Sequence, residues 1–298
     1  MIPARLYRKV GRTPPPLFAT PIPEAFRLAR VSSLVITGYG TNCDRETAHA
    51  ARLAGCNETE VVFFSDLLAE RVALPEADLL LFPGGFLDGD DLGAAQAAAL
   101  RWRHAVTRSG SPLLEQLRAF LERGGLILGI CNGFQLLCKL GLLPAVDGDW
   151  FKRTASLSAN DSARFEDRWV SLRTEPDTRC VFLKGTDRLE MPVRHGEGKM
   201  VFEDESLLSK AEAAGHVALR YVHPESGEPS MEYPYNPNGS PGGIAGLTDH
   251  TGRILGLMPH PEAFNHPTNH PGWTRGETSP LGIVLLENAV HHLRERAA

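Results

Sequence analysis

The sequence of 298 residues has no excess of positive charge, no long hydrophobic run and no signal peptide. Its net charge is −5, with acidic and basic residues interspersed, which argues against binding to nucleic acid or to an anionic membrane surface. Its longest apolar runs, such as LLLF and LILGIC, are far shorter than the roughly 20 residues that a membrane-spanning helix needs. The missing signal peptide leads us to expect a cytoplasmic protein.

Two kinds of motif are also missing. The cysteines, at positions 43, 56, 131, 138 and 180, form no CxxC repeat, so reduced thiols are expected rather than disulfides. No G-x-x-x-x-G-K-[ST] loop is present, because the nearest string, HGEGKM at 195–200, lacks the leading glycine and the hydroxyl residue. We therefore expect this chain to bind no ATP, metal ion or other cofactor of its own.

Residues 1–30 differ in composition from the rest of the chain. They contain six Arg or Lys residues against one acidic residue, and three consecutive prolines that exclude a regular helix or strand. We interpret this segment as a basic, proline-rich extension and residues 31–298 as one domain. An arm that lies on the body or on a partner and a transit-like segment are the alternatives.

From residue 31 onward, short apolar runs alternate with helix-like segments. The runs are SLVITGYG at 33–40, VVFF at 61–64, ADLLLFPGG at 77–85 and LILGI at 126–130. Repeated βα units predict an α/β fold, with a doubly wound, mostly parallel sheet flanked by helices and ligands at the carboxyl ends of the strands. Thr41 and Asp44 have capping-box spacing and predict the start of a helix that stops at Gly55.

Cys131 lies where the strand LILGI meets the helical segment NGFQLLCKL. Gly129, Cys131 and Gly133 form G-x-C-x-G, the pattern of a nucleophile elbow, in which small residues let a sharp turn expose the nucleophile. A thiol at a helix N-terminus is also favoured as thiolate. Cys138, two turns further along the helix, is predicted to lie in the core.

A cysteine nucleophile needs a base, and His260 is the best candidate. It follows an apolar strand in ILGLMPHPEAF, and in extended geometry Glu262 points to the same side and can orient it. A solvent-exposed turn histidine is the alternative. A metal cluster that adds His266 and His270 is a second alternative, which the nearby prolines disfavour.

Acyl transfer also requires donors for an oxyanion. The strand-end loop PGGF offers the unhindered amides of Gly84 and Gly85, and the Asn132 amide follows the nucleophile directly. A plain tight turn would explain the two glycines equally well.

Five ordered motifs carry a family resemblance: PGGF at 83–86, GICNGFQLL at 129–137, HGEGK at 195–199, NPNGS at 236–240 and GLMPHPE at 256–262. They resemble class I glutamine amidotransferases of flavodoxin-like fold, with some added antiparallel strands. GYGTNCDRETAHA at 38–50 and RFEDRWVSLR at 164–173 narrow the likeness to the glutaminase subunits of phosphoribosylformylglycinamidine synthase, an enzyme of purine biosynthesis.

The resemblance implies a role for each matching residue. Cys131 would be the nucleophile, His260 the general acid and base, and Glu262 its orienter. Gly84 and Asn132 would supply oxyanion amides. The residues implied to hold glutamine are Gln135, His195 and Glu197.

The implied activity is hydrolysis of glutamine and delivery of ammonia to a separate synthetase subunit, which would hold the ATP and Mg²⁺, with a small accessory subunit as a further partner. A cysteine hydrolase of another γ-glutamyl substrate and a non-catalytic regulatory subunit are the alternatives. PGGFLDGDDLG at 83–93 and NHPTNHPGWTRG at 265–276 depart from the family pattern, and the second predicts a lid or a docking surface.

Overall fold

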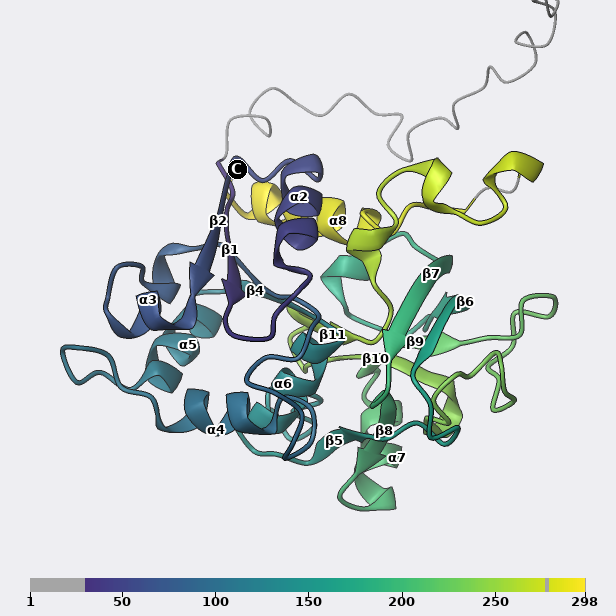
Figure 1. Ribbon diagram of the computed structural model, residues 1–298, viewed down its shortest axis with the longest axis horizontal. Coiled ribbons are helices and arrows are strands. Elements are labelled where there is room, and N and C mark those ends of the chain that lie inside the picture. Colours follow the sequence, from purple (N-terminus) through teal and green to yellow (C-terminus); the bar gives the residue numbers. More distant parts are fainter. Residues whose placement is uncertain (1–29, 277–278, 298) are drawn as a thin grey trace, which may run out of the picture.

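The computed structural model describes residues 30–276 and 279–297 (Figure 1). All but the last residue of the predicted N-terminal extension therefore lies outside the described residues. The strands are β1 (Ser32–Thr37), β2 (Glu58–Phe63), β3 (Leu79–Phe82), β4 (Leu126–Ile130), β5 (Ala155–Ser158), β6 (Glu166–Thr174), β7 (Arg188–His195), β8 (Lys199–Phe202), β9 (Val217–Tyr221), β10 (Ile244–Thr248) and β11 (Ile254–Leu257). The α-helices are α2 (Asp44–Leu53), α3 (Phe64–Leu68), α4 (Gln96–His104), α5 (Leu113–Glu122), α6 (Asn132–Leu140), α7 (Glu205–Ala213) and α8 (Val284–Ala297).

One nine-stranded sheet organises the described chain, in the order β2-β1-β3-β4-β11-β10-β9-β6-β7. The first five of these strands pair in parallel. The other four continue the sheet with antiparallel pairings, and β5 and β8 form a separate antiparallel pair. The predicted doubly wound α/β fold with added antiparallel strands is confirmed.

Helices cover both faces of the parallel part of the sheet. In Figure 1, α2 and α8 lie on one side of it, whereas α4, α5 and α6 lie on the other. The central strands β3 and β4 are buried along their whole length. This two-sided burial explains why LLLF and LILGI are continuous apolar runs rather than alternating patterns.

The local helix signals are partly confirmed. Gly55 and Gly141 follow α2 and α6 with φ of 99° and 79°, a conformation that favours glycine at a helix end. The capping box at Thr41 is wrong: Cys43 occupies the N-cap position without a side-chain cap, and the Asp44 carboxylate accepts a hydrogen bond from Thr37 at 2.9 Å. The βα turn is therefore longer than the spacing suggested.

The antiparallel end of the sheet curls back toward the ends of the parallel strands. The amide of His260 donates to the carbonyl of Pro192 in β7 at 2.8 Å, and Val193 forms an isolated β-bridge with Pro259. Strand β7, at the edge of the sheet, thus contacts the segment that follows β11. This contact places the antiparallel strand β7 against the edge of the sheet where the parallel strands end.

The segment 265–276 packs on the antiparallel strands and not over the strand ends. Its His270 side chain is buried, lies 3.1 Å from a carboxylate oxygen of Glu190 in β7, and packs edge-on against Trp169 of β6. None of its residues lines the cavity of about 660 Å³ that lies at the ends of the parallel strands. The lid interpretation therefore receives no support. Within the described residues, no helix combines the length and the apolar character needed to cross a membrane.

Candidate active site

Cys131 occupies the sharp turn between β4 and α6, as the G-x-C-x-G pattern predicts. Its φ of 52° and ψ of −103° fall in a region that L-residues rarely adopt. Glycine is required on both sides. A Cβ at Gly133 would lie 2.0 Å from the carbonyl oxygen of Phe82, and one at Gly129 would lie 2.5 Å from Leu137. The small residues thus let α6 pack closely enough to form the elbow.

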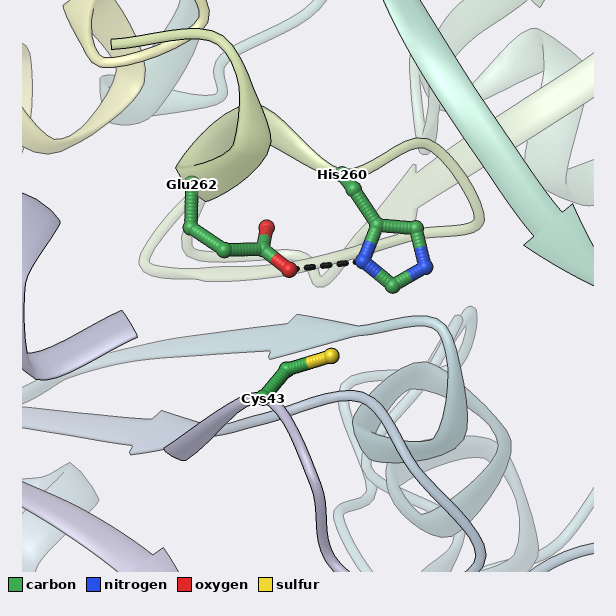
Figure 2. A group of neighbouring side chains, drawn as sticks. All are labelled: Cys43, His260 and Glu262. Carbon is green, nitrogen blue, oxygen red and sulfur yellow. Dashed lines mark hydrogen bonds and ion pairs between the residues drawn. The ribbon is translucent and has the colours of Figure 1, made fainter. Parts of the chain in front are cut away.

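His260 and Glu262 form a buried pair at the end of β11. The Nδ1 atom of His260 lies 2.6 Å from Oε1 of Glu262, and both side chains are at most 3% exposed (Figure 2). Burial opposes protonation of His260, but the Glu262 carboxylate and the neighbouring thiols of Cys131 and Cys43 outweigh it. The pKa of His260 therefore lies well above its ordinary value. The carboxylate fixes the ring orientation and favours the imidazolium.

Gly84 is the point around which the site is assembled. A Cβ at this position would lie 2.8 Å from Cε1 of His260 and 3.5 Å from both Cβ of Cys131 and Sγ of Cys43. The ends of β3, β4 and β11 and the turn after β1 therefore meet here. Gly84 leaves the space that the Cys131 and His260 side chains need, a requirement separate from any oxyanion role.

Cys43 is the residue of this cluster that the sequence analysis missed. Figure 2 shows its sulfur directed toward the His260–Glu262 pair. Its place at a strand-to-helix junction, the same kind of position as that of Cys131, was an available signal. Cys138, by contrast, is fully buried inside α6 as predicted, and burial raises the pKa of its thiol.

A cavity of about 660 Å³ opens beside these residues. It is lined by Cys131 and His260 and by all three residues that the family resemblance assigned to glutamine binding, Gln135, His195 and Glu197. The structure thus brings the proposed nucleophile, base and binding residues to one space. Its size is that of a small-molecule site.

The three predicted binding residues already have protein partners. Gln135 donates to the backbone carbonyl of Glu197 at 2.6 Å and accepts from Asn132 at 3.0 Å. The Glu197 carboxylate accepts from the amide of Ala94 at 3.0 Å. Burial lowers the pKa of His195 to about 4, which keeps its ring neutral near pH 7. These contacts hold the HGEG loop against α6 and shape the cavity wall.

The predicted oxyanion donors lie on adjacent elements. Asn132 is the first residue of α6, directly after Cys131. The Gly84 carbonyl accepts the amides of Asn42 and Cys43, whereas the amides of Gly84 and Gly85 have no hydrogen-bond acceptor in the described part of the chain. Free amides beside the nucleophile are what an oxyanion hole needs.

The alternative metal cluster is not assembled. His270 faces Glu190, and the exposed His266 ring lies 2.8 Å from the hydroxyl of Thr268. In the parts of the chain that the structure describes, one group of three candidate ligands is close enough for a metal ion, and it consists of Cys43, His260 and Glu262. His266 and His270, which the predicted metal cluster required, make these other contacts instead.

Comparison with known proteins agrees with the fold. The model of the CobB/CobQ-like glutamine amidotransferase domain matches residues 30–293. The chain belongs to this family of glutamine amidotransferases.

Similar proteins define the group within that family. The chain is 42% identical over 270 residues to the phosphoribosylformylglycinamidine synthase subunit PurQ of Dehalococcoides mccartyi, a match that covers 90% of this chain and 100% of that relative. It is 40% identical to the PurQ subunit of Methanococcus maripaludis strain C7, over 88% of this chain and 97% of that relative. The solved structure of PurLQS from Thermotoga maritima matches 89% of this chain and 100% of its own, with a TM-score of 0.65 and 28% identity. The chain is thus a PurQ-type member of the family.

Proposed function

We propose that this chain is the glutaminase subunit of a phosphoribosylformylglycinamidine synthase in the cytoplasm. It hydrolyses glutamine to glutamate and passes the ammonia to a separate synthetase subunit. The observation that carries the proposal is the strained Cys131 elbow, which shares a cavity of about 660 Å³ with a buried His260 held by Glu262. This arrangement supplies a nucleophile, an acid and base, and an orienting carboxylate.

The first half of the reaction forms a thioester. The Cys131 thiolate attacks the side-chain amide carbon of glutamine, and a carbon–sulfur bond forms as the carbonyl electrons move to oxygen. The amides of Asn132 and of Gly84 or Gly85 stabilise this oxyanion. When the intermediate collapses, the carbon–nitrogen bond breaks and His260 protonates the departing nitrogen, which leaves as ammonia.

The second half releases glutamate. His260, now neutral, removes a proton from water, and the hydroxide attacks the γ-glutamyl thioester. Collapse of this second tetrahedral intermediate breaks the carbon–sulfur bond and restores the Cys131 thiolate. Glu262 stabilises the imidazolium each time it forms and holds the ring in one orientation.

The ammonia-consuming step belongs to a partner that binds ATP and Mg²⁺. Two aromatic side chains that line the cavity, Phe86 and Phe165, are 46% and 56% exposed. Exposed aromatic residues beside an active-site opening are typical of a surface that a partner covers. We assign this rim to the synthetase subunit, and a small accessory subunit completes the proposed assembly.

Ammonia release from glutamine, measured with and without the synthetase subunit, tests the proposal. Cys131→Ala should abolish release, whereas the matched variant Cys138→Ala in the same helix should retain it. If ammonia release were lost in Cys138→Ala and retained in Cys131→Ala, the assignment of Cys131 as nucleophile would be refuted. Release from another γ-glutamyl compound but not from glutamine would instead identify the alternative hydrolase, and no release in the full assembly would identify a regulatory subunit.

A further inference from the structure

One carboxylate of the cavity takes no part in the mechanism described above. Asp90 lies in the loop after β3 and lines the same space of about 660 Å³ as Cys131 and Gln135. We propose that its carboxylate binds the α-ammonium group of glutamine and so selects an α-amino acid as the substrate. This inference rests on the proposed glutaminase function and adds to it a residue that determines specificity.

The Asp90 side chain has an oxygen atom that lacks a hydrogen-bond donor. Its Oδ1 atom is buried and has no hydrogen-bond partner in the described part of the chain. A buried carboxylate oxygen without a donor is costly, because it has lost its hydration and has gained no hydrogen bond in exchange. Burial, followed by the neighbouring Glu197 carboxylate, raises the pKa of Asp90 accordingly. A cation that enters the cavity would relieve both penalties.

A tight turn fixes this carboxylate at the cavity wall. The carbonyl of Asp90 accepts the amide of Gly93 at 2.8 Å, and Gly93 has a φ of 91°, which favours glycine. The next residue, Ala94, is buried. Its amide donates to the Glu197 carboxylate, and its carbonyl accepts a hydrogen bond from the Lys139 side chain of α6. The turn is thus anchored to two other segments, which holds Asp90 in place before a ligand arrives.

Glu197, a second carboxylate that lines the cavity, already has partners within the protein. It accepts the Ala94 amide at 3.0 Å. The Nζ atom of Lys139 and Oε2 of Glu197 lie 3.7 and 4.0 Å from the same point, the position of a Cβ on Gly93. Burial lowers the pKa of Lys139, and Glu197 opposes this shift more strongly than Asp90 does. Glu197 therefore has a counter-charge nearby, whereas the Asp90 carboxylate is left for a ligand.

The charges around the cavity fit a zwitterion. Two basic residues, Arg164 and Arg194, line it together with the carboxylates, so an α-carboxylate and an α-ammonium both find opposite charge there. In the described residues, the one group close enough to hold a metal ion does not include Asp90, so an organic cation fits this carboxylate better. Glutamine carries its ammonium group at the end opposite to the amide that Cys131 attacks. Binding at Asp90 would thus orient the amide toward the nucleophile.

Kinetics with two compounds test the inference in the chain combined with its synthetase subunit. The first compound is glutamine. The second is glutaramate, which is glutamine without the α-ammonium group, measured as a competitive inhibitor whether or not it is hydrolysed. Asp90→Asn should raise KM for glutamine about 10- to 100-fold, because a charge-assisted hydrogen bond is lost. The same variant should leave the inhibition constant of glutaramate unchanged.

Asp91→Asn is the matched control. It removes the same charge from the next residue, which is exposed and does not line the cavity, and it should leave both constants unchanged. An equal rise of both constants in Asp90→Asn would show that this carboxylate only shapes the cavity, and an unchanged KM would show that it does not contact the substrate. Either result would overturn the proposal, as would a wild-type protein without preference for glutamine over glutaramate.

A binding measurement separates this inference from the proposed function. Calorimetric titration of the assembly carrying Cys131→Ala, with and without Asp90→Asn, measures glutamine affinity in the absence of hydrolysis. The affinity should fall about 10- to 100-fold when Asp90 is replaced. If the wild type releases no ammonia from glutamine but its glutamine affinity depends on Asp90, the proposed function fails and the amino-acid site stands. If ammonia is released and the affinity does not depend on Asp90, the function stands and this inference fails.

Discussion

Replacing Cys131 by glycine should relieve backbone strain that the elbow imposes. The φ of 52° and ψ of −103° correspond to the first central position of a type II′ turn, where glycine predominates. Holding a residue other than glycine in such a conformation costs about 1–3 kcal/mol. The free energy of unfolding therefore contains a penalty at the position of the proposed nucleophile.

The penalty can be isolated by comparing alanine with glycine at two cysteines. Cys131 and Cys138 are 6% and 0% exposed, and Cys138 lies in regular α-helix. An alanine-to-glycine change removes one buried methyl group and adds chain entropy to the unfolded state at both positions. These costs are shared, so the change at 131 should be about 1–3 kcal/mol more favourable than the change at 138.

Urea unfolding of the four variants Cys131→Ala, Cys131→Gly, Cys138→Ala and Cys138→Gly provides the measurement. Equal m-values would show that the unfolded states remain comparable. If the two alanine-to-glycine steps agreed within about 0.5 kcal/mol, which is the usual scatter for independent sites, the elbow would store no strain and the reasoning would be refuted.

Three further predictions concern the rest of the site. Gly84→Ala should lower kcat about 100-fold by displacing the His260 ring. Gly38→Ala is the control and should have a much smaller effect, because its Cβ would meet a movable methyl group of Leu87 at 2.7 Å. Similar losses of kcat in the two variants would contradict the steric explanation. Because the folded-state pKa of His260 is raised, the stability that its pair with Glu262 contributes is complete below about pH 6.5 and is lost as the pH rises through that raised pKa. The loss of unfolding free energy caused by Glu262→Gln, measured by urea unfolding, should accordingly become smaller from pH 6 to pH 9. A difference between variant and wild type that stays constant over this range would contradict the raised pKa of His260. Burial depresses the pKa of His195 to about 4, so the free energy of unfolding of the wild type should fall by about 1.4 kcal/mol per pH unit between the unfolded and folded pKa values of this residue. His195→Gln should remove this pH dependence. An unchanged slope in the variant would exclude His195 as its cause.

Local sequence patterns were sufficient for the Cys131 elbow and for the His260–Glu262 pair, because the relevant residues are close in the chain. They were not sufficient at Thr41, where the predicted capping box is wrong. Gly129 and Gly133 flank Cys131 within one turn, and His260 and Glu262 are two residues apart. Their geometry follows from strand and turn conformation alone, so the elbow and the histidine held by a carboxylate could be predicted. The apolar runs LLLF and LILGI likewise indicated buried parallel strands. The run VVFF, interpreted in the same way, lies in the edge strand β2, of which only Val62 is buried, and its last residue, Phe64, begins α3.

Contacts between distant segments could not be predicted in this way. Cys43 approaches His260 because both pack against Gly84, which follows β3. The sheet order that places β1 beside β3 is not written in either local pattern. The contact of β7 with the segment after β11 similarly depends on how the antiparallel strands curl. The local motif at Gly84 suggested a backbone amide donor. In the structure, the absence of a side chain at Gly84 leaves room for Cys43, Cys131 and His260.

The sequence by itself determined the α/β alternation, the choice of Cys131 over Cys138, and the pairing of His260 with Glu262, because backbone periodicity acts over a few residues. Only the tertiary structure decided which side chains surround that pair, since packing joins segments that are far apart in the chain. That packing placed a second thiol, Cys43, beside His260, and excluded His266 and His270 from the site.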